Sequence, residues 1–279
     1  MGGKQVKILK MICFYALLFI ISILWIIPIF TLISTALKSK TDFFNNFSLF
    51  ALPPRIAWEN ITSAIFEGRL WTYMKNDLFI CTVKIPLGIF FEALAAFALT
   101  RLNIKHKTGI FIFFLIGMMI PMQITLVPIN IMYSKLNLTN TYFGLFYAYI
   151  GFGLSFGILI FRGFFRSIPA DIDEAALIDG CNKLRLFWNI ILPISKPAIA
   201  TLIITDFLAT WNEYLLASVI ITDNAKKTVP VGIMTFIGEH WTDYGLLCAG
   251  VLVSIVPVVI VYLIFQRYFV EGVAGAVKA

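Results

Sequence analysis

The stretch MICFYALLFIISILWIIPIFTLI, residues 11–33, runs for 23 residues without an Asp, Glu, Lys or Arg side chain. A helix of about 20 apolar residues crosses the roughly 30 Å hydrocarbon core of a bilayer, so this stretch predicts a transmembrane helix. A cleaved secretory signal peptide is the alternative, because three lysines precede the stretch and Ser34-Thr35-Ala36 follows it. The stretch is longer than the apolar region of a signal peptide, and further spans follow it, which favours a membrane span.

Five more apolar stretches are long enough to cross a bilayer. They occupy residues 78–98, 109–133, 142–161, 198–220 and 244–264. Hydrophobic residues make up 60% of the 279-residue chain and charged residues 13%, whereas soluble domains carry about 25% charged residues. This composition excludes a soluble globular protein and a disordered chain, and four scattered cysteines exclude a disulfide-stabilised scaffold. We therefore predict an all-α integral membrane protein with six transmembrane helices in a single domain, residues 1–279.

The distribution of Lys and Arg predicts how the chain is oriented. With the N-terminus inside, the inner segments 1–10, 99–108, 162–197 and 265–279 hold 13 Lys and Arg in 71 residues, and the outer segments hold 8 in 75. Because positively charged loops stay on the cytoplasmic side, we expect both termini in the cytoplasm. The net charge of +7 then reflects topology and not nucleic-acid binding. The long outer loop 34–77 is expected to contain a short folded segment, or else aromatic interface anchors.

Four ionisable residues fall at membrane depth, namely Lys84, Glu92, Asp206 and Glu213. Inserting each one costs about 2.5–3.5 kcal/mol, so we expect all four to face the bundle interior or water. Lys84 and Glu213 lie at similar depth when counted from the outer ends of their spans, which predicts that they pair. An ion-coupled secondary transporter, with Asp206 and Glu213 as proton or sodium sites, is an alternative function for these residues.

Prolines and polar side chains within the spans indicate a bundle around a cavity. Pro121 and Pro128 interrupt the third span, and membrane helices tolerate such breaks where neighbours or water satisfy the freed backbone groups. Amides, carboxylates and flat aromatic faces can bind a hydroxyl-rich solute. The candidates for a solute pathway are Gln123, Asn130, Tyr147, Tyr149, Trp211, Asn212 and Glu213. Ordinary interhelical hydrogen bonding explains any one of these amides equally well.

The cytoplasmic connection, residues 162–197, has the features of two short helices. Asp171 and Glu174 are spaced as in a capping box, and Gly180 suits a left-handed turn. These signals predict a helix over residues 172–179.

A second cytoplasmic helix is expected over residues 182–191, with Pro193 and Pro197 ending it before the fifth span. On the first of these helices, Ala175 and Ala176 are too small to provide much packing of their own but small enough for a groove of another protein to close over them. This favours a docking site, with a folded loop that merely covers the bundle as the alternative.

The run Glu174-Ala175-Ala176, followed by Gly180 and then by Ile190-Ile191-Leu192-Pro193, resembles at full spacing the EAA motif of permease subunits of binding-protein-dependent ABC importers. The chain is most similar to carbohydrate-uptake permeases of the kind that includes the smaller membrane subunit of the maltose importer. The resemblance extends through Asn76-Asp77-Leu78, Met119-Ile120-Pro121, Leu126-Val127-Pro128, Trp211-Asn212-Glu213-Tyr214, Gln266-Arg267-Tyr268-Phe269-Val270 and Gly275-Ala276-Val277-Lys278. Cys181, Asp77, Lys84 and Glu92 depart from the family pattern.

This resemblance implies a type I ABC importer permease in a bacterial or archaeal cell membrane, with the EAA loop forming a coupling helix. The implied ATPase-coupling residues are Glu174, Ala175, Ala176, Asp179, Gly180 and Pro193. The implied partners are a second homologous permease, two ATP-binding subunits and an extracellular or periplasmic sugar-binding protein. ATP and Mg then belong to the ATPase subunits, and this chain is expected to have no cofactor, metal or catalytic residue. The solute is expected to be a di- or oligosaccharide, with a polyol or glycerol phosphate as the alternative.

Overall fold

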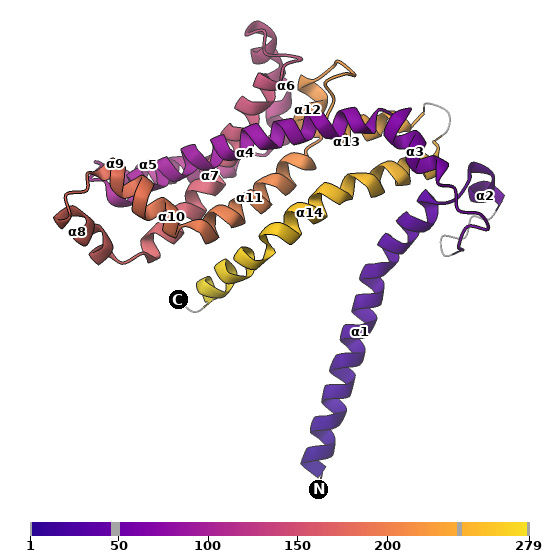
Figure 1. Cartoon of the computed structure of the whole chain (residues 1–279), viewed down its shortest axis with the longest axis horizontal. Coiled ribbons are helices and arrows are strands. Elements are labelled where there is room, and N and C mark those ends of the chain that lie inside the picture. Colours follow the sequence, from indigo (N-terminus) through magenta and orange to yellow (C-terminus); the bar gives the residue numbers. More distant parts are fainter. Residues whose placement is uncertain (1, 46–50, 239–241, 278–279) are drawn as a thin grey trace. The chain divides into compact units, whose positions relative to one another are not determined.

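The structure is a computed structural model that describes residues 2–45, 51–238 and 242–277, so Lys278 lies outside the described residues. Its helices are labelled in Figure 1. In chain order they are α1 (Gly2–Ala36), α2 (Lys40–Asn45), α3 (Glu59–Phe66), α4 (Leu70–Arg101), α5 (Lys107–Met118), α6 (Met122–Lys135), α7 (Tyr142–Ser167), α8 (Ala170–Ile178), α9 (Lys183–Leu186), the π-helix η1 (Phe187–Ile191), α10 (Leu192–Ile194), α11 (Lys196–Trp211), α12 (Leu215–Ile220), α13 (Val229–Ile233), the 3₁₀ helix η2 (Met234–Phe236) and α14 (Tyr244–Val277). Across these ranges the only β pairing is an isolated bridge between Ile237 and Thr242, so the predicted all-α class is confirmed.

The chain divides into two compact units, one formed by Met1–Leu70 with Ile233–Ile255 and the other by Trp71–Gly232 with Val256–Ala279. In the first unit, the side-chain amide of Asn60 donates hydrogen bonds to the carbonyl oxygens of Ala36 and Lys38, at 2.9 and 2.8 Å. These bonds satisfy carbonyl groups that the end of α1 leaves without helical partners. The predicted folded segment of the outer loop is thus present as α2 and α3, although α4 begins earlier than expected.

Four helices, α1, α4, α7 and α14, are long and apolar enough to cross a membrane on their own. Two further candidates are bent pairs: α5 with α6, bent by 94°, and residues Lys183–Ile194 with α11, bent by 73°. By length and composition, the described part of the chain therefore contains four candidate spans, or up to six if each bent pair counts as one.

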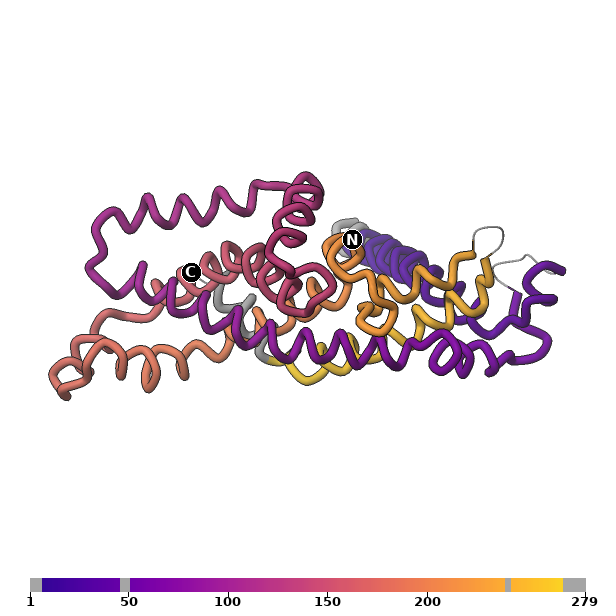
Figure 2. Tube along the Cα trace, turned by 90° about the horizontal axis from the view of Figure 1, so that it is seen from above, coloured from indigo at the N-terminus to yellow at the C-terminus, as the bar shows by residue number. Residues whose placement is uncertain are grey.

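The third predicted span, residues 109–133, is interrupted near Pro121 as expected, because the helix stops after Met118 and restarts at Met122 (Figure 2). Pro121 has an extended backbone, with φ −63° and ψ 129°. Proline has no N–H group to donate and disfavours the helical conformation of the residue before it, which explains the break. Pro128, in contrast, is accommodated inside α6.

The predicted fifth span, residues 198–220, is also interrupted. The helix α11 ends at Trp211, and α12 begins at Leu215. The Glu213 carboxylate lies in the break and accepts hydrogen bonds from the backbone N–H groups of Leu216 and Ala217, at 2.8 and 2.9 Å. A carboxylate at this position satisfies free donors of the first turn and interacts favourably with the helix dipole.

The helices α4 and α7 meet where α7 carries glycine. The carboxyl group of Glu92 on α4 is fully buried and fills the space beside Gly157, so that a Cβ atom at this glycine would collide with it. Gly153 lies one turn earlier, and its Cβ position would be 3.4 Å from Lys84 Nζ and 3.7 Å from Glu92 Oε1. Small residues at this spacing usually let two helix backbones approach. Here they make room for charged side chains instead.

We expect Gly157→Ala to lower the thermal stability of the protein, because the added methyl group overpacks the site filled by Glu92, at a cost of about 1–3 kcal/mol. Gly163→Ala is the matched control on the same helix, since nothing lies within 4 Å of its Cβ position. The melting temperature of each variant in detergent is measured, and Glu92→Ala in the Gly157→Ala background should recover part of the loss. Equal melting temperatures for the two alanine variants would contradict this packing.

Candidate functional site

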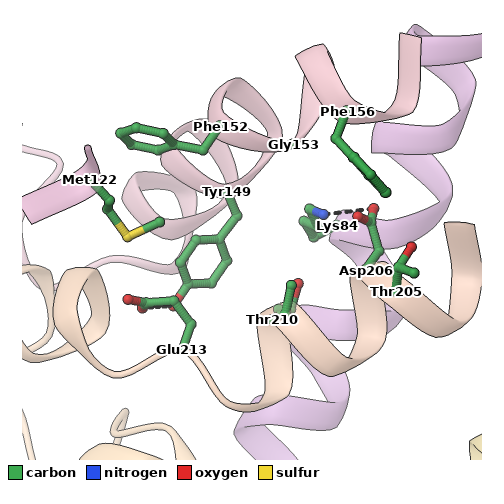
Figure 3. A pocket seen from close by; sticks show the side chains of 11 residues that line it. Lys84, Met122, Tyr149, Phe152, Gly153, Phe156, Thr205, Asp206, Thr210 and Glu213 are labelled. Atoms are coloured by element: carbon green, nitrogen blue, oxygen red, sulfur yellow. Dashed lines mark hydrogen bonds and ion pairs between the residues drawn. The ribbon is translucent and has the colours of Figure 1, made fainter. Parts of the chain in front are cut away.

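A cavity of about 350 Å³ lies among α4, α6, α7, α11 and the break that precedes α12 (Figure 3). Its lining combines charged groups, hydroxyl groups and aromatic rings. The lining residues are Lys84, Met122, Tyr149, Phe152, Gly153, Phe156, Thr205, Asp206, Ala209, Thr210 and Glu213. All of them belong to the second compact unit. This cavity brings together residues from four distant parts of the sequence.

One wall of the cavity is an ion pair between helices. The ammonium group of Lys84 on α4 lies 2.7 Å from the Asp206 carboxylate on α11, and both side chains are buried (Figure 3). The predicted pairing of Lys84 with Glu213 is therefore wrong. That prediction assumed a straight fifth span, whereas the break before α12 turns the Glu213 side chain toward other partners.

Glu213 is held by hydrogen bonds at the opposite end of the cavity. Besides the two backbone N–H groups of α12, its carboxylate accepts a 2.7 Å hydrogen bond from the hydroxyl group of Tyr149 (Figure 3). Charge-assisted hydrogen bonds of this kind are stronger than neutral ones. Glu213 therefore ties α7 to the start of α12 and fixes one end of the cavity.

The second carboxylate near Lys84 belongs to Glu92. It is fully buried, and neither of its oxygens has a hydrogen-bond partner among the described residues. Lys84, Gly88 and Glu92 follow at intervals of four residues, so they share one face of α4. A Cβ atom at Gly88 would lie 3.5 Å from Glu92 Oε1 and 3.7 Å from Asp206 Oδ2. Lys84 thus has two carboxylates in its surroundings, and only one of them is engaged. The side chains of Lys84, Glu92 and Asp206 are all buried within the chain.

Of the residues predicted to line a solute pathway, some line the cavity and others lie outside it. Tyr149 and Glu213 line the cavity, whereas Tyr147 is 63% exposed. Trp211 is buried with its ring stacked on Phe207 at 5.4 Å, and it does not line the cavity. Gln123, Asn130 and Asn212 are exposed and lie outside the cavity lining.

Phe152 and Phe156 line the cavity, although the sequence reasoning passed over them. Together with Tyr149 they are spaced at i, i+3 and i+7, the interval that places side chains on one face of a helix. This spacing is visible in the sequence. Because many aromatic residues in this chain face lipid, the spacing alone does not separate a cavity wall from a lipid-facing surface.

The sequence predicted the end of α8 better than its start. The proposed cap at Asp171 is wrong, because α8 begins at Ala170, two residues before the predicted start, after the extended Pro169, and has no side-chain cap. Its C-terminus has the predicted left-handed residue, Gly180 at φ +77°. The N–H groups of Cys181 and Gly180 donate to the carbonyl oxygens of Ala176 (2.9 Å) and Leu177 (3.1 Å). This is the double hydrogen bond of a Schellman turn, and it closes the helix rigidly.

Ala175 and Ala176 of α8 were both expected to be available to a partner protein, and the structure differs at Ala176. Ala176 is buried within the chain itself, so of the two alanines only Ala175 remains available for an outside contact. Glu174 and Asp179 are exposed. Ile178, which the sequence reasoning did not select, is 86% exposed. The open surface of α8 therefore mixes carboxylates with apolar side chains.

The predicted second cytoplasmic helix is longer and less regular than expected. The Asn182 side chain caps it by accepting a 2.8 Å hydrogen bond from the N–H of Arg185. The run then continues through α9, the π-helix and α10 to Ile194. Pro193 lies inside α10, and the helix continues for one residue beyond it. The chain bends only at Ser195, before α11.

Comparison with known proteins identifies similar sequences and folds. Residues 84–274 match the family described as "Binding-protein-dependent transport system inner membrane component". The "Probable starch degradation products transport system permease protein AmyC" of Thermoanaerobacterium thermosulfurigenes is 36% identical over 261 residues, which cover 93% of this chain and 94% of that protein. The "Trehalose/maltose transport system permease protein MalG" of Thermococcus litoralis is 37% identical over 209 residues, which cover 74% of this chain and 75% of that protein.

Solved structures show the same fold. A chain in the crystal structure of a bacterial ABC transporter involved in the import of the acidic polysaccharide alginate aligns with a TM-score of 0.82 and 25% identity, covering 96% of this chain and 99% of that chain. A chain of the bacterial alginate ABC transporter in complex with an alginate pentasaccharide-bound periplasmic protein aligns with a TM-score of 0.67 and 16% identity.

We expect Lys84→Met to destabilise the protein more than Asp206→Leu does. Removing one partner of a buried ion pair costs about 3–5 kcal/mol, and the lysine change leaves Asp206 unpaired beside the buried carboxyl group of Glu92. The aspartate change leaves Lys84 with Glu92 nearby. Thermal unfolding in lipid nanodiscs measures both variants and the double variant, whose loss should be smaller than the sum of the single losses. The assignment fails if Asp206→Leu is the more damaging change or if the losses are additive.

Proposed function

Because this chain belongs to the family of binding-protein-dependent transport system inner membrane components, we propose that it forms half of the translocation pathway of an ATP-driven carbohydrate importer. The family makes it a membrane permease subunit of ABC transport and not an enzyme. The observation that carries the proposal is the cavity at membrane depth, where an ion pair and hydroxyl groups lie beside aromatic rings. With such a lining, a polar solute can cross the apolar part of the protein.

The proposed solute is a di- or oligosaccharide. Sugar rings present hydroxyl groups at their edges and apolar C–H groups on their faces, so they suit the hydroxyl groups of Thr205 and Thr210 together with the rings of Phe152 and Phe156. A glycerol phosphate is less well matched, because phosphate calls for a free cation and Lys84 is already paired with Asp206. The names of the two relatives, which refer to starch degradation products and to trehalose and maltose, support the carbohydrate class.

The importer requires further subunits. The partners in this proposal are a second homologous permease, two ATP-binding subunits and an external sugar-binding protein, with ATP and Mg held by the ATP-binding subunits. The apolar side chains of α1 are left unburied, which supports contact with lipid or with a second permease. The Lys and Arg distribution supports cytoplasmic termini, with residues 162–197 on the side of the ATP-binding subunits.

The helix α8 is the proposed coupling helix. Its Schellman turn makes it a rigid element, and its exposed residues Glu174, Ala175, Ile178 and Asp179 offer both charge and apolar area to a partner. ATP binding closes the ATP-binding subunits on each other, and this movement carries α8 with it. Because a ligand shifts an equilibrium only through its different affinities for the two states, ATP must bind the closed arrangement more tightly.

Glu174→Lys is expected to reduce sugar uptake at least tenfold in proteoliposomes containing the assembled transporter, because it reverses a charge on the proposed docking surface. Asp171→Asn, a change at an exposed residue of the same helix, is the control and should leave uptake near the wild-type rate. Gly180→Pro should act like Glu174→Lys, since proline cannot adopt the positive φ of Gly180. Wild-type coupling of ATP hydrolysis to uptake in both the Glu174→Lys and Gly180→Pro transporters would rule out α8 as the coupling helix.

Phe156→Ala is expected to lower uptake about fivefold while the basal ATPase rate is unchanged, because an aromatic contact contributes about 0.5–1.5 kcal/mol beyond its buried area. The matched control is Phe143→Ala on the same helix, at a residue that is exposed and lies outside the cavity lining. Uptake and ATP hydrolysis are measured on the same proteoliposomes. Equal uptake by the two variants would argue against passage of the sugar along this wall.

A further inference from the structure

The attachment of α8 to the membrane helices depends on few contacts. Among its side chains, α8 buries that of Ala176. Within the described residues, Asp173 is the one side chain of α8 that takes part in an ion pair or hydrogen bond. Its carboxylate lies 3.0 Å from Nε of Arg101, the last residue of α4. This pair therefore dominates the polar connection between α8 and the membrane helices.

Arg101 also contacts the end of α7. Its Nη2 donates a 2.9 Å hydrogen bond to the carbonyl oxygen of Ile168, the residue that follows the last turn of α7. The side chains of Arg101 and Asp173 are only 11% and 15% exposed, so water screens the pair little. One planar guanidinium group thus joins α4, the end of α7 and the first turn of α8, a geometry that lysine cannot reproduce.

One contact of Arg101 lies within the backbone break between α7 and α8, and the other lies in α8 after the break. Ile168 and Pro169 are both extended, with ψ 122° and 141°, so the chain between α7 and α8 is not helical. Such a link lets two helices change their mutual angle. Because Arg101 binds the carbonyl group of Ile168 within the link and the Asp173 carboxylate after it, the guanidinium group restrains that angle.

We propose that Arg101 is the positioning residue that passes the movement of α8 to α4 as well as to α7. This inference rests on the proposed role of α8 as the coupling helix. The same continuous helix α4 carries Arg101 at its end and Lys84 at the cavity, 17 residues earlier and about 25 Å away at 1.5 Å per residue. Movement of α8 therefore reaches the Lys84–Asp206 wall through one continuous helix, which contains Pro86, and not only through the peptide link to α7.

Arg101→Gln in the assembled transporter tests this inference, with sugar transported per ATP hydrolysed as the readout in proteoliposomes. We expect the variant to hydrolyse ATP but to transport about tenfold less sugar per ATP, the effect of losing a charge-assisted contact. Arg101→Lys should give an intermediate value. The matched control is Arg166→Gln, at an exposed arginine in the last turn of α7 that has no ion pair or hydrogen bond among the described residues, and it should leave the ratio unchanged.

The Asp173→Asn variant shows whether the two residues act as a pair. If they do, the double variant Arg101→Gln/Asp173→Asn transports no less sugar per ATP than Arg101→Gln alone. If Arg101→Gln fails to assemble, Asp173→Asn gives the same readout, because it keeps the hydrogen bond to Ile168. A wild-type ratio in Arg101→Gln, or additive losses in the double variant, would overturn the inference.

Glu174→Lys, measured in parallel, separates this inference from the proposed function. If Glu174→Lys retains coupling, α8 is not the coupling helix, and both proposals fail. If Glu174→Lys uncouples the transporter and Arg101→Gln does not, the proposed function stands and the inference about Arg101 alone is wrong.

Discussion

Inside a bilayer, every backbone N–H and C=O group needs a partner within the protein, and this requirement shapes the whole chain. It explains why the long apolar stretches form uninterrupted helices such as α4 and α7. It also sets a condition on the places where a helix stops. The break before α12 meets that condition because the Glu213 carboxylate accepts hydrogen bonds from two free N–H groups.

The side chains that provide hydrogen bonds to the backbone at such breaks also line the cavity proposed to bind the solute. Glu213 serves the backbone of α12 and at the same time holds the hydroxyl group of Tyr149 at one end of the cavity. At the other end, Lys84 and Asp206 satisfy each other across α4 and α11. A cavity built in this way is stable without a solute, since most of its charge is already paired within the protein.

Short-range features of the loop 162–197 followed from its sequence better than the membrane helices did. Gly180 has the predicted left-handed conformation, and the second helix begins next to Asn182, close to the predicted position. Asp171 failed as a cap because Pro169 starts the helix earlier. Arg101 was overlooked for a different reason. In the sequence it is one of several arginines in the segments predicted to be cytoplasmic, and its contacts with Ile168 and Asp173 arise only when α4, α7 and α8 are assembled.

The sequence by itself determined the class of the protein, because the length and apolarity of a span depend on consecutive residues alone. It also determined the left-handed turn after α8, since only glycine adopts a positive φ without strain. The tertiary structure alone decided that Lys84 pairs with Asp206, a residue 122 positions away, and not with Glu213. Such a pairing depends on how far each helix is rotated and where it breaks, and both are set by the packing of its neighbours.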